Sequence, residues 1–188
     1  MVICCEVTIG KLKFTALSSI EIKSSWRNFT DTARISIPKA IYGKYESVYK
    51  LLSIRDLIKT GDKVVIKLGY NTQLITEFEG YVAYSPYGTI PYVIECEDEM
   101  WQLKRKKVSV SLENATVKQI IQAVAPEYDL DCVDELYGDF SMKETTPVKV
   151  FRELQEKAGL YTFFRGGKLV CGKIYLNENL PKTHHFLK

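Results

Sequence analysis

The sequence has 188 residues, of which 46% are hydrophobic and 26% are charged, and its formal net charge is +3. This balance is typical of a globular chain that buries a substantial core, and it excludes a mainly disordered protein. The small positive charge argues against a dedicated nucleic-acid-binding protein. No apolar run approaches the roughly 18–20 residues of a membrane span, so we expect no membrane insertion.

The first third of the chain is predicted to form β-strands. An apolar run over residues 2–9, a tight turn at Gly10-Lys11 and a second run over 12–16 indicate a hairpin. Apolar and polar residues alternate over 20–26 and again over 32–37, which predicts two half-buried strands, and Pro38 ends the second.

Residues 39–60 show a different spacing. Tyr42, Tyr45, Tyr49 and Leu52 recur at helix-like intervals, which predicts a long connection containing one or two short helical turns.

Strands are predicted again over residues 63–70, 74–84 and 91–97, with a turn over 85–88. Gly80 inside the second of these strands indicates a bulge or a bend. A single helical turn over 98–101 and a strand over 108–112 follow. These elements predict a small antiparallel β-barrel domain over residues 1–112.

Residues 113–176 are predicted to form an α+β subdomain with two helices and a C-terminal hairpin. Asn114 or Thr116 is the predicted N-cap of the first helix, which ends before Pro126. Thr146 and Gly159 bound the second helix, and Pro147 is its first residue. A strand is expected over 128–133, and the hairpin turns at residues 165–167. Residues 177–188 are predicted to form an extended polar tail. The fold class is therefore a β-rich α+β protein.

The five cysteines do not indicate a disulfide framework. Their number is odd, no CxxC pair occurs, and Cys4 and Cys5 are adjacent in a predicted strand. They are expected to be small buried hydrophobic residues in a reducing compartment. Residues 1–10 also lack the features of a signal peptide, so synthesis in the cytoplasm is expected.

Few residues point to catalysis. His184 and His185 are the only histidines and lie in the polar tail, so no histidine base is available for nucleophilic catalysis. Glu95 and Glu97 resemble a glycosidase pair, but their place in the strand predicts a solvated outer face. The basic run over 104–107 is interpreted as a solvated strand edge. We therefore expect no enzyme, no catalytic residue, no cofactor and no metal.

Several segments together resemble a known family. The stretch from Thr60 to Tyr70, followed by Phe78 to Val82, resembles the barrel of phage tail hub proteins. That group includes the late-control protein D family and the hub region of type VI secretion spike proteins. Segments from the rest of the chain also resemble the family: 26–33, 94–103, the helix openings at Thr116 and Thr146, and the step over 158–161.

The resemblance implies a structural role in a phage, prophage or contractile injection system tail. Hubs of this kind are implied to form homotrimers, with two similar barrels from each subunit, and to join the tail tube to the spike of the baseplate. The implied partners are copies of the chain itself and the tube and spike proteins. The implied location after assembly is the virion tail. One departure is that this chain shows a single barrel.

Aromatic residues are the candidates for an assembly interface, because Tyr and Trp are enriched at interface centres. Tyr84, Tyr87 and Tyr92 surround a predicted turn and are proposed as contact residues. Replacing Tyr87 with Glu is expected to impair assembly and leave the fold intact. Two alternatives stay open: a carbohydrate- or cell-wall-binding barrel, whose mark would be a concave aromatic groove, and a tail-associated wall hydrolase.

Overall fold

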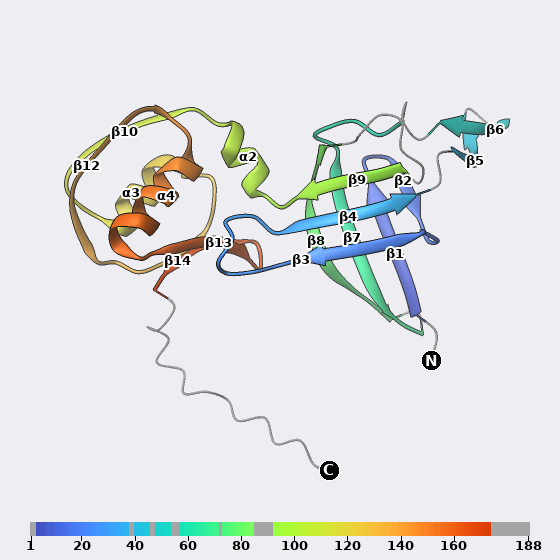
Figure 1. Ribbon diagram of the computed structural model, residues 1–188, viewed down its shortest axis with the longest axis horizontal. Coiled ribbons are helices and arrows are strands. Elements are labelled where there is room, and N and C mark those ends of the chain that lie inside the picture. Colours follow the sequence, from blue (N-terminus) through green and yellow to red (C-terminus); the bar gives the residue numbers. More distant parts are fainter. Residues whose placement is uncertain are drawn as a thin grey trace, which may run out of the picture. The chain divides into compact units, whose positions relative to one another are not determined.

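The structure is a computed structural model that describes residues 3–37, 40–45, 48–53, 57–71, 73–84 and 92–173 (Figure 1). The chain divides into two compact units, residues 1–105 and 106–188. The strand β10 (Val108–Thr116) pairs with β12 (Leu136–Thr145), so it belongs to the second unit. The boundary therefore lies before this strand and not after residue 112.

The first unit contains a seven-stranded antiparallel sheet with the order β2-β1-β7-β8-β9-β4-β3. Its strands are β1 (Ile3–Ile9), β2 (Leu12–Phe14), β3 (Ser19–Lys23), β4 (Thr32–Ile37), β7 (Lys63–Tyr70), β8 (Gln73–Tyr84) and β9 (Tyr92–Glu97). The predicted opening hairpin is confirmed, and Gly10 takes the positive φ of +54° that its turn requires.

Within the described residues this sheet is curled and is not closed into a barrel, so the β-rich part of the predicted fold is confirmed and the small barrel stays a prediction. Closure requires the two edge strands to pair, whereas β2 pairs with β1 and β3 pairs with β4. Partly buried apolar side chains cover the core instead, among them Leu12, Leu17, Ile20 and Ile22. A curled sheet and a barrel bury the same alternate residues, so periodicity cannot distinguish them.

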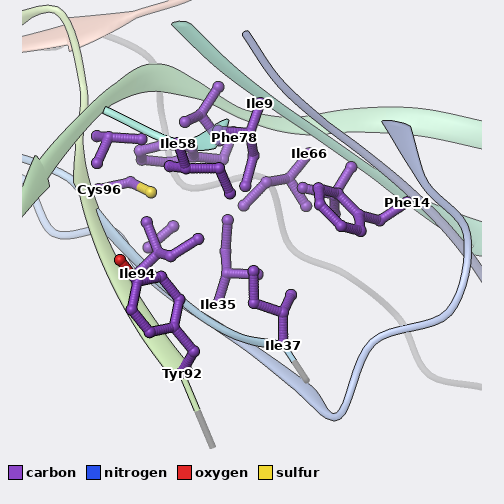
Figure 2. Packing of buried hydrophobic residues seen from close by; sticks show 14 residues of the cluster. Ile9, Phe14, Ile35, Ile37, Ile58, Ile66, Phe78, Tyr92, Ile94 and Cys96 are labelled. Carbon is purple, nitrogen blue, oxygen red and sulfur yellow. The ribbon is translucent and has the colours of Figure 1, made fainter. Parts of the chain in front are cut away.

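The core of the first unit lies on one face of the curled sheet. Figure 2 shows Ile35 and Ile37 of β4 directed toward side chains of β1 and β7, including Ile9 and Ile66. All four of these isoleucines are at most 1% exposed. The predicted alternation over residues 32–37 thus places its apolar face in the core.

The strand β8 connects the two halves of this sheet. Residues from Gln73 to Tyr81 pair with β7, whereas only residues from Tyr81 to Tyr84 pair with β9. A bulge in the pairing with β7 falls at Glu77, and the strand continues through Gly80. A change of partner along one strand, assisted by a bulge, bends a sheet.

The connection over residues 39–60 contains strands, so the prediction of helical turns there is wrong. Strand β5 (Ala40–Tyr45) pairs with β6 (Val48–Ser53) in a separate two-stranded antiparallel sheet. Tyr, Ile and Val in this segment favour extended backbone, so the helix-like spacing of the tyrosines does not produce a helix.

The second unit packs two helices with two small sheets. Helix α3 (Val117–Val124) buries Val117, Ile120, Ile121 and Val124. Thr116 rather than Asn114 is its N-cap, and Thr116 and Gln119 form a reciprocal capping box. Strand β12 was not predicted, because Gly138, Asp139 and Lys143 interrupt its apolar pattern.

Helix α4 (Pro147–Ala158) begins after Thr146 and ends at Gly159, whose φ of +65° is left-handed, as its predicted role requires. The backbone of Thr146 stands at the cap position, but its side chain makes no capping hydrogen bond. The last sheet has the order β11-β14-β13, formed by β11 (Leu130–Cys132), β13 (Tyr161–Arg165) and β14 (Lys168–Gly172). The predicted C-terminal hairpin turns through Gly166-Gly167, both at positive φ. The predicted tail, residues 177–188, lies outside the described residues.

Candidate functional site

Charged side chains form two rows across the outer face of the first sheet. Register aligns Glu21 of β3 with Arg34 of β4 and Glu95 of β9, and Arg34 Nη2 lies 2.8 Å from Glu95 Oε1. In the next row Lys104 Nζ lies 2.7 Å from Glu97 Oε2. The outer positions of β9 are therefore occupied by charge pairs, as expected of a solvated face.

Lys104 comes from helix α2 (Met100–Arg105), which is longer than the single turn expected over 98–101. The run over 104–107 is not the edge of a strand. Lys104 and Arg105 lie in the last turn of the helix, where a basic side chain interacts favourably with the helix dipole.

The two charged rows and the helix border a groove of about 560 Å³. Its walls mix acidic and basic side chains with two aromatic ones. The charged and aromatic residues of the walls are Glu21, Lys23, Arg34, Tyr84, Glu95, Glu97, Trp101, Lys104 and Arg105. The groove is therefore polar, and its charges largely neutralise one another.

Trp101 in this groove makes two close ring contacts. The Tyr81 ring stacks on it with centroids 5.4 Å apart, and the Arg105 guanidinium carbon lies 4.4 Å from its centroid. Carbohydrate-binding grooves need an open aromatic face on which a sugar ring can stack. Tyr81 and Arg105 already contact the Trp101 ring, so this observation gives no support to the carbohydrate-binding alternative.

Two buried or partly buried aspartates position the groove's helix. Asp98 is 6% exposed, and its carboxylate accepts hydrogen bonds from the backbone N–H of Asp31 at 3.1 Å and of Met100 at 3.0 Å. Asp31 in turn accepts from the Ser24 hydroxyl at 2.7 Å and from the Ser25 N–H at 3.2 Å. Burial raises the pKa of Asp98 to about 7, against the opposing effect of the two backbone donors. The pair ties the β3–β4 connection to the start of α2.

The structure describes two of the three tyrosines predicted as contact residues, and these two differ in exposure. Tyr84 is 58% exposed and lines the groove, whereas Tyr92 is 6% exposed and belongs to the core. Tyr87 lies outside the described residues. A role of Tyr84, Tyr87 and Tyr92 in assembly stays a prediction.

The tip of the β7–β8 hairpin is an exposed surface that was not predicted from the sequence. Here Tyr70 is 49% exposed and Ile75 is 67% exposed, and residues 73–80 of β8 pair with β7 alone among the described residues. An exposed apolar tip beside an unpaired strand edge is a surface that can bind another chain. The sequence feature that could have indicated this surface is the presence of apolar residues on both sides of the turn at Asn71.

The described part of the chain shows no cluster of side chains that could hold a metal ion. It holds no group of three or more His, Cys, Asp or Glu side chains suited to a metal ion. No helix among the described residues is both long and apolar enough to cross a bilayer. His184 and His185 lie outside those residues, so the structure adds nothing on them.

Comparison with known proteins gives structural matches only. No protein-family model matches the sequence, and no curated protein matches it. The 43 kDa tail protein of prophage MuSo2 from Shewanella oneidensis matches 92% of this chain with a TM-score of 0.64 at 15% identity. A tail protein from Neisseria meningitidis MC58 matches 90% with a TM-score of 0.63 at 12% identity.

These matches show that the chain has a fold found in prophage tail proteins. It spans 56% of the Shewanella protein and 50% of the Neisseria protein, so it corresponds to about half of each. Identities this low carry the fold and not the function.

Proposed function

We propose that the chain is a non-enzymatic structural subunit of a phage or prophage tail. More specifically, we propose a baseplate hub protein of the late-control protein D type, which joins the tail tube to the spike. It is synthesised in the host cytoplasm and resides in the virion tail, or in a related contractile injection machine.

The observation that carries the proposal is the fold shared with two tail proteins across nine-tenths of this chain. Both units take part in that match, so it does not rest on a common small sheet alone. The match is independent of the sequence resemblance to hub proteins, which rests on short segments of both units.

The surface of the first unit supports an assembly role. Its sheet has open edges at β2 and β3 among the described residues, and the β7–β8 tip exposes Tyr70 and Ile75. Open edges and exposed apolar side chains are costly for a chain that stays alone in water, and binding to neighbouring subunits covers them.

Nothing in the described residues favours catalysis. The two groove carboxylates on β9 are engaged by Arg34 and Lys104. The buried Asp98 is engaged by backbone donors. A peptidoglycan-release assay is therefore expected to show no activity.

The mass of the purified protein in solution, from size exclusion with light scattering, tests the proposal. We expect a trimer, or a monomer that gains mass when tail tube and spike proteins of the same tail are added. A monomer that binds neither protein would contradict the hub role.

A pair of variants tests the surface. Ile75→Glu is expected to reduce assembly, since it places a charge on the exposed tip, and Leu136→Glu is the matched control. Leu136 is 73% exposed but lies in the second unit. Equal assembly by both variants would exclude the β7–β8 tip as a contact surface.

A further inference from the structure

Two cysteines that are far apart in the sequence are direct neighbours in the last sheet. Strands β11 and β14 are parallel, and their register aligns Cys132 with Cys171. Adjacent strands lie about 4.8 Å apart, and residues directly opposite each other project to the same face. A disulfide joins Cα atoms about 4.4–6.8 Å apart, so the backbone already meets this requirement.

The two thiols also interact with each other. The Cys132 thiol donates a hydrogen bond to the Val133 carbonyl oxygen at 3.2 Å. The neighbouring thiol lowers the pKa of Cys171 and raises the pKa of Cys132. Both cysteines are free in this structure, and their register places both side chains on the same face of the sheet.

The pair differs in access to solvent. Cys171 is 2% exposed, whereas Cys132 is only partly buried and is the last residue of the three-residue strand β11. A reagent in solution can therefore reach Cys132 first. The end of a short strand can also shift by the small amount that a bond between the two sulfurs requires.

The segment after Cys132 is held beside β14 by contacts that do not involve sulfur. The Val133 N–H donates to the Cys171 carbonyl at 3.1 Å, and Lys173 Nζ lies 2.7 Å from Glu135 Oε2. These contacts keep the two thiols together while either one reacts.

The other cysteines of the chain lack such an arrangement. Cys96 is 1% exposed, and burial raises its pKa to about 12, which disfavours the reactive thiolate. Cys4 and Cys5 lie opposite Gly69 and Leu68 of β7, so neither faces a cysteine across that strand pair.

We propose that Cys132 and Cys171 are a reversible redox pair that is a dithiol when the protein is made and becomes an intramolecular disulfide when it meets an oxidising small-molecule disulfide. This inference does not depend on the proposed function. The bond would link β11 to β14 and close a loop of about 40 residues that includes β12 and α4, which restricts the unfolded chain.

The reaction with oxidised glutathione takes two exchange steps. One of the two cysteines, as its thiolate, attacks one sulfur of the oxidant, forms a mixed disulfide and releases one glutathione thiolate. The thiolate of the other cysteine then attacks the protein sulfur of that mixed disulfide and releases the second glutathione thiolate. The two thiols lose two protons, and the two electrons pass to glutathione.

The test uses the full chain incubated with oxidised glutathione, followed by non-reducing peptide mapping. We expect the loss of two hydrogen atoms and a cross-linked peptide containing Cys132 and Cys171. The thermal midpoint of the second unit, followed by circular dichroism, should rise by about 10 °C and return after dithiothreitol.

Two variants sharpen the result. Cys132→Ser should abolish both the cross-link and the rise, whereas Cys5→Ser, which removes another partly buried thiol, should retain both. A lasting glutathione adduct on Cys132 with a free Cys171 would overturn the proposal. The absence of any reaction, or disulfides that use other cysteines, would also overturn the proposal. Peptide mapping of the unaltered chain gives this answer even if a variant folds poorly.

Discussion

Gly80 lies in β8 where a side chain would collide with the neighbouring backbone. A Cβ added there would stand 2.1 Å from the Glu97 carbonyl oxygen and 2.9 Å from the Asp98 Cα. Neither atom can rotate away, because both belong to the main chain. Gly80→Ala must therefore displace the end of β9 from β8 by more than about 1 Å to reach ordinary contact distances.

The expected cost follows from what that displacement breaks. The pairing of β8 with β9 extends only from Tyr81 to Tyr84, so a shift at Glu97 removes a large part of it. Loss of about two backbone hydrogen bonds costs about 2 kcal/mol. Overpacking adds about 1–3 kcal/mol, and the stiffer unfolded chain returns about 0.4–1 kcal/mol. The net loss in unfolding free energy is about 3 kcal/mol, or a fall in the thermal midpoint on the order of 15 °C.

Tryptophan fluorescence is a suitable assay, because both tryptophans, Trp26 and Trp101, lie in the first unit. The control is Gly172→Ala, followed by circular dichroism, since its nearest contact would be an ordinary 3.7 Å to a Val133 methyl group. That variant should be neutral or slightly stabilising. A midpoint for Gly80→Ala within error of the parent would refute the close approach of β8 and β9.

Three further predictions follow from buried or capping groups. The pKa of Asp98 is raised from 3.8 to about 7, so the folded state holds a proton that the unfolded chain releases between these pH values. This carboxyl should make the first unit less stable as pH rises from about 4 to about 7, by up to about 1.4 kcal/mol per pH unit. Urea titrations across this range should show that the unfolding free energy of Asp98→Asn depends less on pH than that of the parent. The same pH dependence for both proteins would contradict this prediction. Phe151 has 0% exposure, so Phe151→Ala should lower the unfolding free energy of the second unit by about 3–5 kcal/mol, measured by circular dichroism. An equal loss of stability in the first unit, followed by tryptophan fluorescence, would show that the two units do not unfold separately. Thr116→Ala removes the capping box of α3 and should cost about 1 kcal/mol of unfolding free energy. Thr146→Ala should cost less, because the Thr146 side chain makes no capping hydrogen bond. Equal losses for the two variants in urea unfolding would contradict this difference in capping.

Local signals in the sequence predicted much of the fold. Alternation over 32–37, the Gly-Gly turn and the Thr146-Pro147 and Gly159 signals act within a few residues, so they can be read without knowing the rest of the chain. The helix-like spacing over 39–60 failed, because strand pairing between β5 and β6 satisfies the backbone whatever the side-chain spacing.

The candidate site was less accessible to sequence reasoning. The outer face of β9 was expected to carry Glu95 and Glu97, but the pairing of Glu97 with Lys104 depends on α2 crossing near that strand. The burial of Tyr92 and the exposure of Tyr84 depend on which face of the curled sheet each residue occupies.

The sequence by itself determined the β-rich first part, the α+β second part, the start and end of α4 and the turn of the last hairpin, since these follow from local propensity and hydrophobic period. Only the tertiary structure decided that the first sheet is open among its described strands, that β10 belongs to the second unit, and that Cys132 lies beside Cys171. These features are set by strand order and register between distant segments. Residues that pair across a sheet carry no mark of their partner in the local sequence, because the backbone groups that join them are the same at every position.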